Sequence, residues 1–261
     1  MVLEKSKKND TRLPSVATLP APGVLAVVEQ DRLAAFGDMS VENVVMPRLV
    51  IVQKMSPEVD DGSAKGGEFF IKGLGINMGT NPLEIIPVRR DVSKIRWKDK
   101  TGASGGILCR ARDGHTGVGT PGGNCTVCPE THWNGEESPS CDHYENVLVI
   151  LRGDPDMMPF LLSGNRTNLK AMKGLNTLLL QEFIKGRPIF TKSYLVGIVK
   201  KAQADRVWWN FTFRPGNDNK PLPVEDQKRA ADVFSKFKNV RLEDSAEPVT
   251  DTREAESAPT I

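Results

Sequence analysis

The four cysteines of the chain fall within one 33-residue window and are spaced C-x15-C-x2-C-x12-C. They are Cys109, Cys125, Cys128 and Cys141. A two-residue gap lets the thiolates of Cys125 and Cys128 bind one ion from a single tight turn, and the other two cysteines can complete a tetrahedron. The residues between them are rich in Gly, Thr, Asn, Pro and Ser, so a metal would supply the folding free energy that apolar burial does not. The window therefore predicts a structural Zn²⁺ site.

The four thiols also have alternative uses. An iron–sulfur cluster also takes four thiolates, and His115, His132 or His143 could replace one cysteine. Disulfides need an oxidising compartment, whereas residues 1–10 lack the apolar stretch of a signal peptide. Unligated cysteines usually pack as small apolar side chains, which does not suit a polar loop. Zinc is therefore favoured, and four cysteine ligands would leave no open position for catalysis.

Composition points to a soluble protein with an uneven charge distribution. No apolar run approaches the ~20 residues that cross a bilayer, so we expect no membrane partner. The net charge is +2, but residues 242–261 contain six acidic residues and one basic residue, which leaves +7 on residues 1–241. A basic body with an acidic end is typical of a nucleic-acid-binding protein whose tail contacts other proteins.

Two segments, 89–98 and 200–214, mix cations with tryptophan. Cations neutralise phosphates, and indole rings stack on bases at about 1–3 kcal/mol per base. The alternative for each tryptophan is an ordinary packed side chain. The residues expected to contact nucleic acid are Arg89, Arg90, Lys94, Arg96, Trp97, Lys98, Trp133, Lys200, Lys201, Arg206 and Trp208.

Catalytic signatures are weaker. No Ser/His/Asp or Cys/His hydrolase arrangement is visible. The G-x-G-x-x-G match at 117–122 lies in a Pro-containing loop between two cysteines, where the dinucleotide fingerprint does not occur. We therefore expect a binding protein rather than an enzyme.

The elements that must position these residues are mostly strands. Apolar and β-branched runs predict them over 47–53, 68–74, 83–89, 145–152, 159–163, 193–201 and 206–214. In the last strand, alternation places Trp209, Phe211 and Phe213 inward with Val207, and Trp208 outward.

Helices are few. A weak pattern predicts a short helix over 24–36. The apolar stripe Leu169, Met172, Leu175, Leu179 and Phe183 predicts an internal helix that begins near Asn165 or Thr167. A last helix over 224–238 should turn inward Ala230, Ala231, Phe234 and Phe237.

This order lacks strand–helix alternation and predicts a mainly β (α+β) fold, a small β-barrel with one internal and one C-terminal helix. We expect a flexible basic arm at 1–22, a core domain at 23–240 with a zinc-binding insertion at about 105–143, and an acidic disordered tail at 241–261.

The layout resembles phage-type single-stranded-DNA-binding proteins, in particular the zinc-containing helix-destabilising proteins of T-even phages. The likeness covers residues 45–215 and includes the Cys-x-x-Cys insertion, then the apolar strand 147–151 and the Asp154-Pro155 turn, with a basic arm before it and an acidic tail after it. Segment 46–59 also resembles segments of phage proteins. That family uses one histidine and three cysteines, with the lone ligands upstream of the pair, whereas Cys141 lies downstream.

The resemblance implies an OB-like barrel, binding of single-stranded DNA in phage replication or recombination, and a cytoplasmic location in a bacterial host. The acidic tail would contact replication or recombination proteins. Two alternatives remain open: a zinc-ribbon adaptor that binds a polymerase or another protein, and a nuclease with an iron–sulfur cluster.

Overall fold

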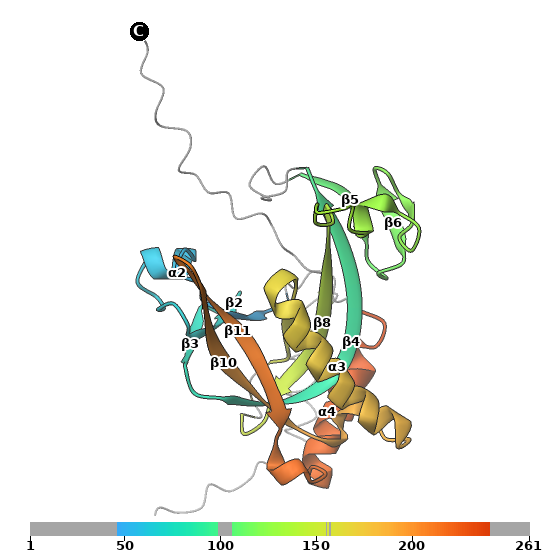
Figure 1. Cartoon of the computed structure of the whole chain (residues 1–261). Coiled ribbons are helices and arrows are strands. Elements are labelled where there is room, and N and C mark those ends of the chain that lie inside the picture. Colours follow the sequence, from blue (N-terminus) through green and yellow to red (C-terminus); the bar gives the residue numbers. More distant parts are fainter. Residues whose placement is uncertain (1–45, 99–105, 155, 157, 241–261) are drawn as a thin grey trace, which may run out of the picture. The chain divides into compact units, whose positions relative to one another are not determined.

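Two long strands, β4 (Leu83–Trp97) and β8 (Cys141–Leu151), organise the fold. They pair antiparallel from Ile85 opposite Leu151 to Arg96 opposite Cys141. The computed structural model describes residues 46–98, 106–154, 156 and 158–240, all within one compact unit (Figure 1). The arm predicted at 1–22, the helix at 24–36 and the tail at 241–261 lie outside the described residues.

The described strands form one mixed sheet in the order β3-β2-β1-β9-β8-β4-β5-β6-β7, and β10 joins β4 and pairs with β11. β1 and β9 run parallel, and the other pairs are antiparallel. The remaining bounds are β1 (Arg48–Ile51), β2 (Phe69–Lys72), β3 (Ile76–Gly79), β5 (Ile107–Ala111), β6 (Thr116–Gly119), β7 (Gly123–Asn124), β9 (Phe160–Gly164), β10 (Tyr194–Gln203) and β11 (Arg206–Pro215).

The mainly β prediction is confirmed, but the OB-like barrel is not. In the described part of the chain no ladder joins the outer strands β3 and β7, so the sheet stays open. One end of the sheet is the two-residue strand β7, which lies inside the cysteine window. At the two ends of this window, Cys109 lies on β5 and Cys141 begins β8.

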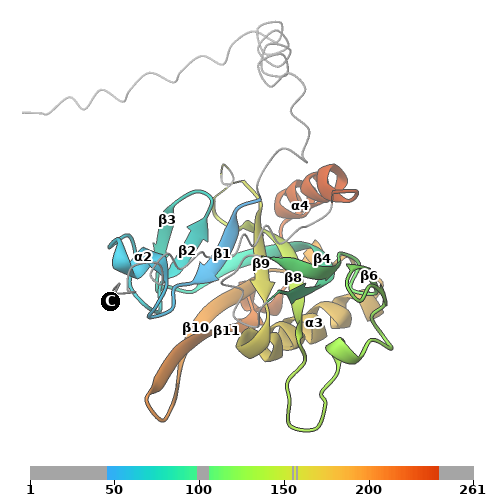
Figure 2. The same ribbon diagram turned by 90° about the horizontal axis from the view of Figure 1, so that it is seen from above.

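The two faces of the sheet carry different hydrophobic clusters. Val147 and Val149 of β8 belong to the cluster under α3 (Leu169–Ile184), whereas Leu148 and Ile150 belong to the cluster under α4 (Val224–Phe237). This is the alternation expected of a strand buried on both sides. Figure 2 shows α3 and α4 on opposite sides of the sheet.

Short helical turns complete the chain. They are α2 (Pro57–Asp60) and the 3-10 turns η2 (Pro129–Thr131), η3 (Arg166–Asn168), η4 (Ile189–Thr191) and η5 (Asn217–Asn219). None of the helices in the described ranges is both long and apolar enough to cross a membrane.

The predicted apolar stripe of α3 is confirmed for all but its last member. Met172, Leu175 and Leu179 are buried, whereas Phe183 is 71% exposed. The prediction was wrong at Phe183 because the inward position of the last turn is taken by Glu182, which is buried beside Lys192.

Similar corrections apply where other elements reach solvent. In α4, Ala230 is buried and Phe237 packs on the core, but Phe234 is 39% exposed. In β11, Trp209, Phe211 and Phe213 contact the core as predicted. The predicted inward position of Val207 is wrong, since it lies near the tip of the hairpin and is 36% exposed.

Candidate functional site

The cysteine window is built on the distal ends of β4 and β8. β4 lies between β5 and β8, so Arg96 stands opposite Cys109 on one side and opposite Cys141 on the other. Residues directly opposite in antiparallel strands point to the same face, which places both thiols beside Arg96. Cys125 is buried, and its backbone N–H donates to the carbonyl oxygen of His115 at 2.8 Å.

The four thiols influence one another electrostatically. Burial raises the pKa of Cys141 to about 12, with further contributions from the other three cysteines. The pKa of Cys125 is also raised, again chiefly by burial. All four cysteines are free. Across the described residues, which include these four, no three His, Cys, Asp or Glu side chains are placed to hold a metal ion. The zinc site therefore stays a prediction.

The glycines of the window have a packing role. Gly119 has a φ of +120°, and an added Cβ would lie 2.1 Å from the carbonyl oxygen of Leu108. Only glycine fits this approach between β5 and β6. The G-x-G-x-x-G match thus shapes a turn of the sheet.

Beside the window lies a cavity of about 640 Å³, which we call the cleft. Trp97, at the end of β4, and Trp133, in the loop after η2, both line it. Trp133 is 69% exposed and Trp97 is half-buried. The structure thus brings together two tryptophans that the sequence separates. The complete lining is Trp97, Trp133, Ser138, Pro139, Ser140, Cys141, Asp142, His143, Arg166, Thr167 and Leu169.

One cation of the cleft was missed by the sequence analysis. Arg166 of η3 donates from Nε to Asp142 Oδ1 and from Nη2 to Asp142 Oδ2, each at 2.9 Å. The arginine side chain is 56% exposed and the aspartate side chain 13%. The two residues are 24 positions apart, and no local pattern pairs them.

The cleft adjoins the outer face of the β10–β11 hairpin. Asn210 of β11 donates from Nδ2 to the carbonyl oxygen of Thr167, which lines the cleft, at 3.2 Å. Trp208 lies two residues away on the same face and stands opposite Lys201 of β10. Trp208 is half-buried. Figure 2 shows the hairpin and the loop between β7 and β8 extending from the side of the sheet that carries α3.

The three predicted arginines of β4 are already ion-paired. Arg89 binds Asp91 at 2.5 Å and donates to the carbonyl oxygen of Phe237, on the α4 side. Arg90 binds Glu145 at 2.6 Å, and Arg96 binds Glu130 at 3.2 Å.

Glu145 connects three elements beneath the cleft. Its Oε1 lies 3.0 Å from Nε2 of His143, and its Oε2 accepts from Asn176 of α3 and from Arg90. The side chain is 5% exposed. Burial alone would raise the pKa of Glu145, but hydrogen bonds from His143 and Asn176 and the charge of Arg90 together lower it. Glu145 is therefore held as a carboxylate that orders the cleft wall.

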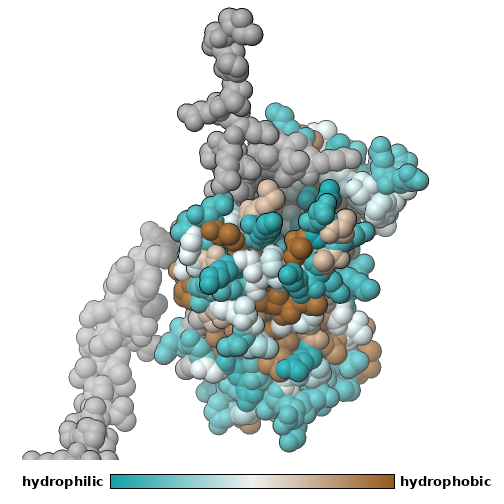
Figure 3. Space-filling view, turned by 60° about the vertical axis from the view of Figure 1, so that its left-hand side comes forward, coloured by the Kyte–Doolittle hydropathy of each residue, from teal (hydrophilic) through white to brown (hydrophobic). Residues whose placement is uncertain are grey.

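The predicted lysines are more accessible. Lys98, Lys200, Lys201 and Arg206 are exposed, and Lys94 is half-buried near the thiols of Cys125 and Cys141. On the side that includes the hairpin, hydrophilic side chains cover much of the described surface, with smaller hydrophobic areas between them (Figure 3).

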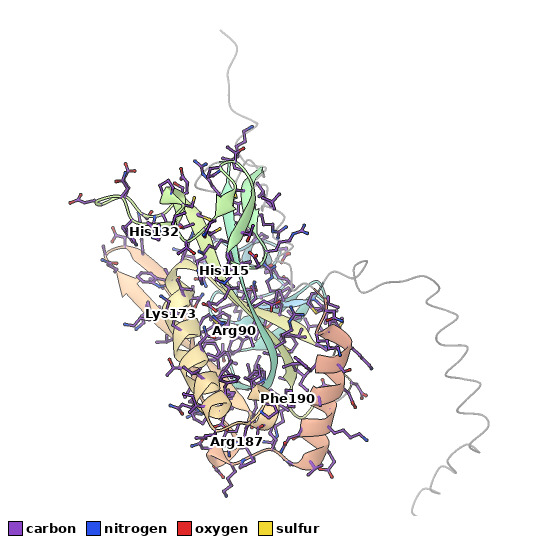
Figure 4. The ribbon with its side chains drawn as sticks, turned by 90° about the vertical axis from the view of Figure 1, so that its right-hand side faces the viewer. Arg90, His115, His132, Lys173, Arg187 and Phe190 are labelled. Carbon is purple, nitrogen blue, oxygen red and sulfur yellow. The ribbon has the colours of Figure 1, made fainter. Side chains whose placement is uncertain are left out.

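Helix α3 adds two exposed lysines, Lys170 and Lys173, that the sequence analysis did not include. Figure 4 labels Lys173 on α3, Arg90 on β4, and His115 and His132 in the cysteine window. The signal that could have found them is the polar side of the helical period, where a cation every third residue faces solvent.

The comparisons with known proteins give one finding. A family model described as Pam3 phage gp34-like protein matches residues 16–242, which is more than half of the 261 residues. No curated protein and no solved structure matches the chain.

Proposed function

Since the chain belongs to the Pam3 phage gp34-like family, we propose that this phage protein binds single-stranded DNA, without catalysis, during phage DNA replication or recombination. The observation that carries the proposal is the cleft of about 640 Å³ that Trp97 and Trp133 line from two different segments. Each ring offers a face for a base, and stacking contributes about 1–3 kcal/mol per base.

The arrangement suits a single strand better than a duplex. In a duplex the faces of the bases are covered by their neighbours, whereas an unpaired base can turn onto an aromatic ring. Stacking reads no base sequence, because every base has a ring face. We therefore expect little sequence preference.

The strand would continue from the cleft to the hairpin. Asn210 links the hairpin to the cleft wall through Thr167, and Trp208 with Lys201 lies on the same face. Arg206 is exposed at the start of β11. Lys98, Lys170, Lys173, Lys200 and Lys201 are exposed cations for the phosphates.

The ion-paired arginines have another role in this proposal. Arg90 and Arg96 contact Glu145 and Glu130, and they hold the strands and the cysteine window in place. Arg89 contacts the end of α4. A structural zinc held by the four cysteines would fix the loop that carries Trp133. The zinc itself would not contact DNA, because protein side chains would make all the contacts.

The test is a titration of an unstructured thymidine oligonucleotide at several salt concentrations. The wild type should bind at low salt and lose affinity as salt rises. Replacing Trp97 and Trp133 together by alanine should weaken binding at least about tenfold, since two stacking contacts are lost. The control variants are Trp209→Phe, at a ring packed against Gly67 and the core, and Lys236→Ala on α4. Absent binding, or an affinity that ignores salt, overturns the proposal.

A second candidate function is an adaptor that binds a protein through the cysteine window. Val118 and Val127 favour it, because each is 77% exposed beside the predicted ligands. Replacing Trp97 and Trp208 by alanine separates the two candidates, because neither residue lies in the cysteine window: an adaptor of this kind would keep its function, while a DNA-binding protein would lose affinity.

A further inference from the structure

We infer that Asp142 is an internal competitor for DNA: it occupies Arg166 in the free protein, and a DNA phosphate takes its place when a strand enters the cleft. The inference rests on the proposed function and concerns the same site. In it, the Arg166–Asp142 pair limits the affinity of the cleft for single-stranded DNA.

The geometry of the pair supports an exchange. Arg166 presents Nε and Nη2 to the two oxygens of Asp142, both at 2.9 Å. A phosphate offers two oxygens with similar spacing, and the planar guanidinium binds carboxylate and phosphate in the same two-point manner. One charge-assisted pair is thus replaced by another of the same kind.

Exposure differs between the partners. The side chain of Arg166 is 56% exposed, so a ligand can approach it, whereas that of Asp142 is 13% exposed. After the exchange the carboxylate would remain in a poorly solvated position beside an incoming phosphate. Both effects oppose binding, since a desolvated charge without its partner and two like charges close together are unfavourable.

The backbone holds Arg166 in place for this role. Its φ is +44°, a left-handed conformation that non-glycine residues rarely adopt. The following residues are fixed by β11, because Thr167 accepts from Asn210 and the Oδ1 of Asn168 accepts from the backbone N–H of Phe211. Strained residues of this kind persist where the surroundings determine them, often at binding sites. The guanidinium can therefore change partners while its backbone stays where it is.

The cleft also brings the phosphate to the right place. Arg166 and Asp142 line the same cavity as Trp97 and Trp133. A strand whose base stacks on either ring therefore passes through the cavity that the pair also lines. The site therefore combines two indole rings that can stack on bases with Arg166, whose charge is partly neutralised by Asp142 before DNA binds.

The experiment compares charge-removing variants in the same oligonucleotide titration. Asp142→Asn should bind the thymidine oligonucleotide about 5- to 10-fold more tightly than the wild type. Its dependence of log affinity on log salt should steepen by about 0.7, the value for one additional contact with a single strand. Arg166→Gln should bind more weakly, and its salt dependence should become shallower by a similar amount. Arg166→Lys keeps the charge but loses the two-point geometry, so its affinity should lie between those of Arg166→Gln and the wild type.

The matched control is Asp226→Asn on α4. Asp226 binds Arg152 at 3.1 Å on the α4 side, so this variant removes the same charge from an arginine pair that does not line the cleft, while Arg152 keeps its ion pair with Glu84 at 2.8 Å. Its affinity should stay within about twofold of the wild type. If Asp142→Asn binds no more tightly than the wild type while the wild type binds DNA, the pair is only structural and the inference is overturned. If the wild type itself does not bind, the proposed function fails first. Should Asp142→Asn not fold, the order of the Arg166 variants decides: Arg166→Gln equal to the wild type contradicts the exchange.

Discussion

The two ends of the β4–β8 ribbon differ in how they are stabilised. At the core end, Ile85, Ile86 and Val88 of β4 are almost fully buried, and so are Leu148 and Ile150 of the paired strand β8. At the distal end, Ile95 is the one buried residue among 94–97, and β8 begins with three half-buried residues. One pair of strands thus serves a hydrophobic core at one end and a polar site at the other.

The distal end has little apolar surface to bury. Within the described residues from 106 to 140, the buried apolar side chains are Ala111 and Cys125. Order there comes from ion pairs, glycine turns and hydrogen bonds such as those that Thr131 donates to the carbonyl oxygens of Cys125 and Cys128. Regions with few buried apolar contacts open at lower free energy than the core does. The comparison predicts that changes at the two ends will have separable effects on stability and binding.

The largest expected effect is at the core end. Phe160 of β9 is fully buried in the cluster under α3. Phe160→Ala should lower the free energy of unfolding by about 3–5 kcal/mol, because it removes apolar contacts and leaves a cavity. Val127→Ala, at an exposed side chain of the distal end, should change it by no more than about 0.5 kcal/mol. Urea denaturation of both variants measures this, and equal losses would contradict the comparison.

The second prediction concerns the charged cluster at the end of α3. Glu182 is 3% exposed and binds Lys192 at 3.2 Å and Arg187 at its other oxygen. Burial, the largest influence, would raise the pKa of Glu182, but Lys192 and Arg187 together lower it. Glu182→Gln should lower the free energy of unfolding by about 3 kcal/mol at pH 7, because it leaves the buried Lys192 without its carboxylate partner.

The lowered pKa of Glu182 also predicts how the free energy of unfolding changes with pH. A lowered folded-state pKa stabilises the protein above the unfolded value of about 4.3, and this contribution is lost as pH falls through the folded value. Stability of the wild type should therefore decrease between pH 5 and pH 3, and more steeply than that of Glu182→Gln. The control is Glu225→Gln, at an exposed glutamate of α4. Parallel pH curves for the wild type and Glu182→Gln would contradict the assignment.

The third prediction tests whether a metal supports the distal end. Native mass spectrometry should show one zinc per chain, and Cys125→Ser should lose it. DNA affinity should then fall about tenfold, or about 1.4 kcal/mol, because the loop with Trp133 loses its support. Urea denaturation of the core should change little. Metal-free wild-type protein with full DNA affinity would show that the distal end needs no metal.

The smallest expected effect is at Phe183. This side chain is 71% exposed although it continues the apolar stripe of α3. Phe183→Ala should change the free energy of unfolding by no more than about 0.5 kcal/mol. Leu179→Ala, one turn earlier at a side chain that is 3% exposed, should lower it by about 2–5 kcal/mol. Similar losses for the two variants would mean that Phe183 is covered in solution.

Local patterns predicted the elements well because their periods follow from backbone geometry. The strands that became β1, β2, β9, β10 and β11 and the helices α3 and α4 were all expected within a few residues of their observed bounds. The extensions of β4 to Trp97 and of β8 to Cys141 were not, since polar residues on a half-exposed ribbon carry no clear alternation.

The candidate site was predicted only in part. Trp97 and Trp133 were expected to stack bases, and they line one cleft. Arg89 was expected to contact phosphate, yet it binds Asp91. It also donates to carbonyl oxygens at the end of α4, about 150 residues later in the sequence. A cation's partner depends on which distant segment lies beside it, and a single sequence does not give that information.

By itself the sequence determined the strand and helix segments, the confinement of all cysteines to one window, and the acidic segment 242–261 of an otherwise basic chain. These properties depend on residue type and spacing alone. Only the tertiary structure decided that the sheet stays open, that Glu182 displaces Phe183 from the core, and that Arg166 meets Asp142 in the cleft with two tryptophans. Each of these outcomes depends on contacts between residues far apart in the chain, where packing and desolvation rather than local propensity determine the energy.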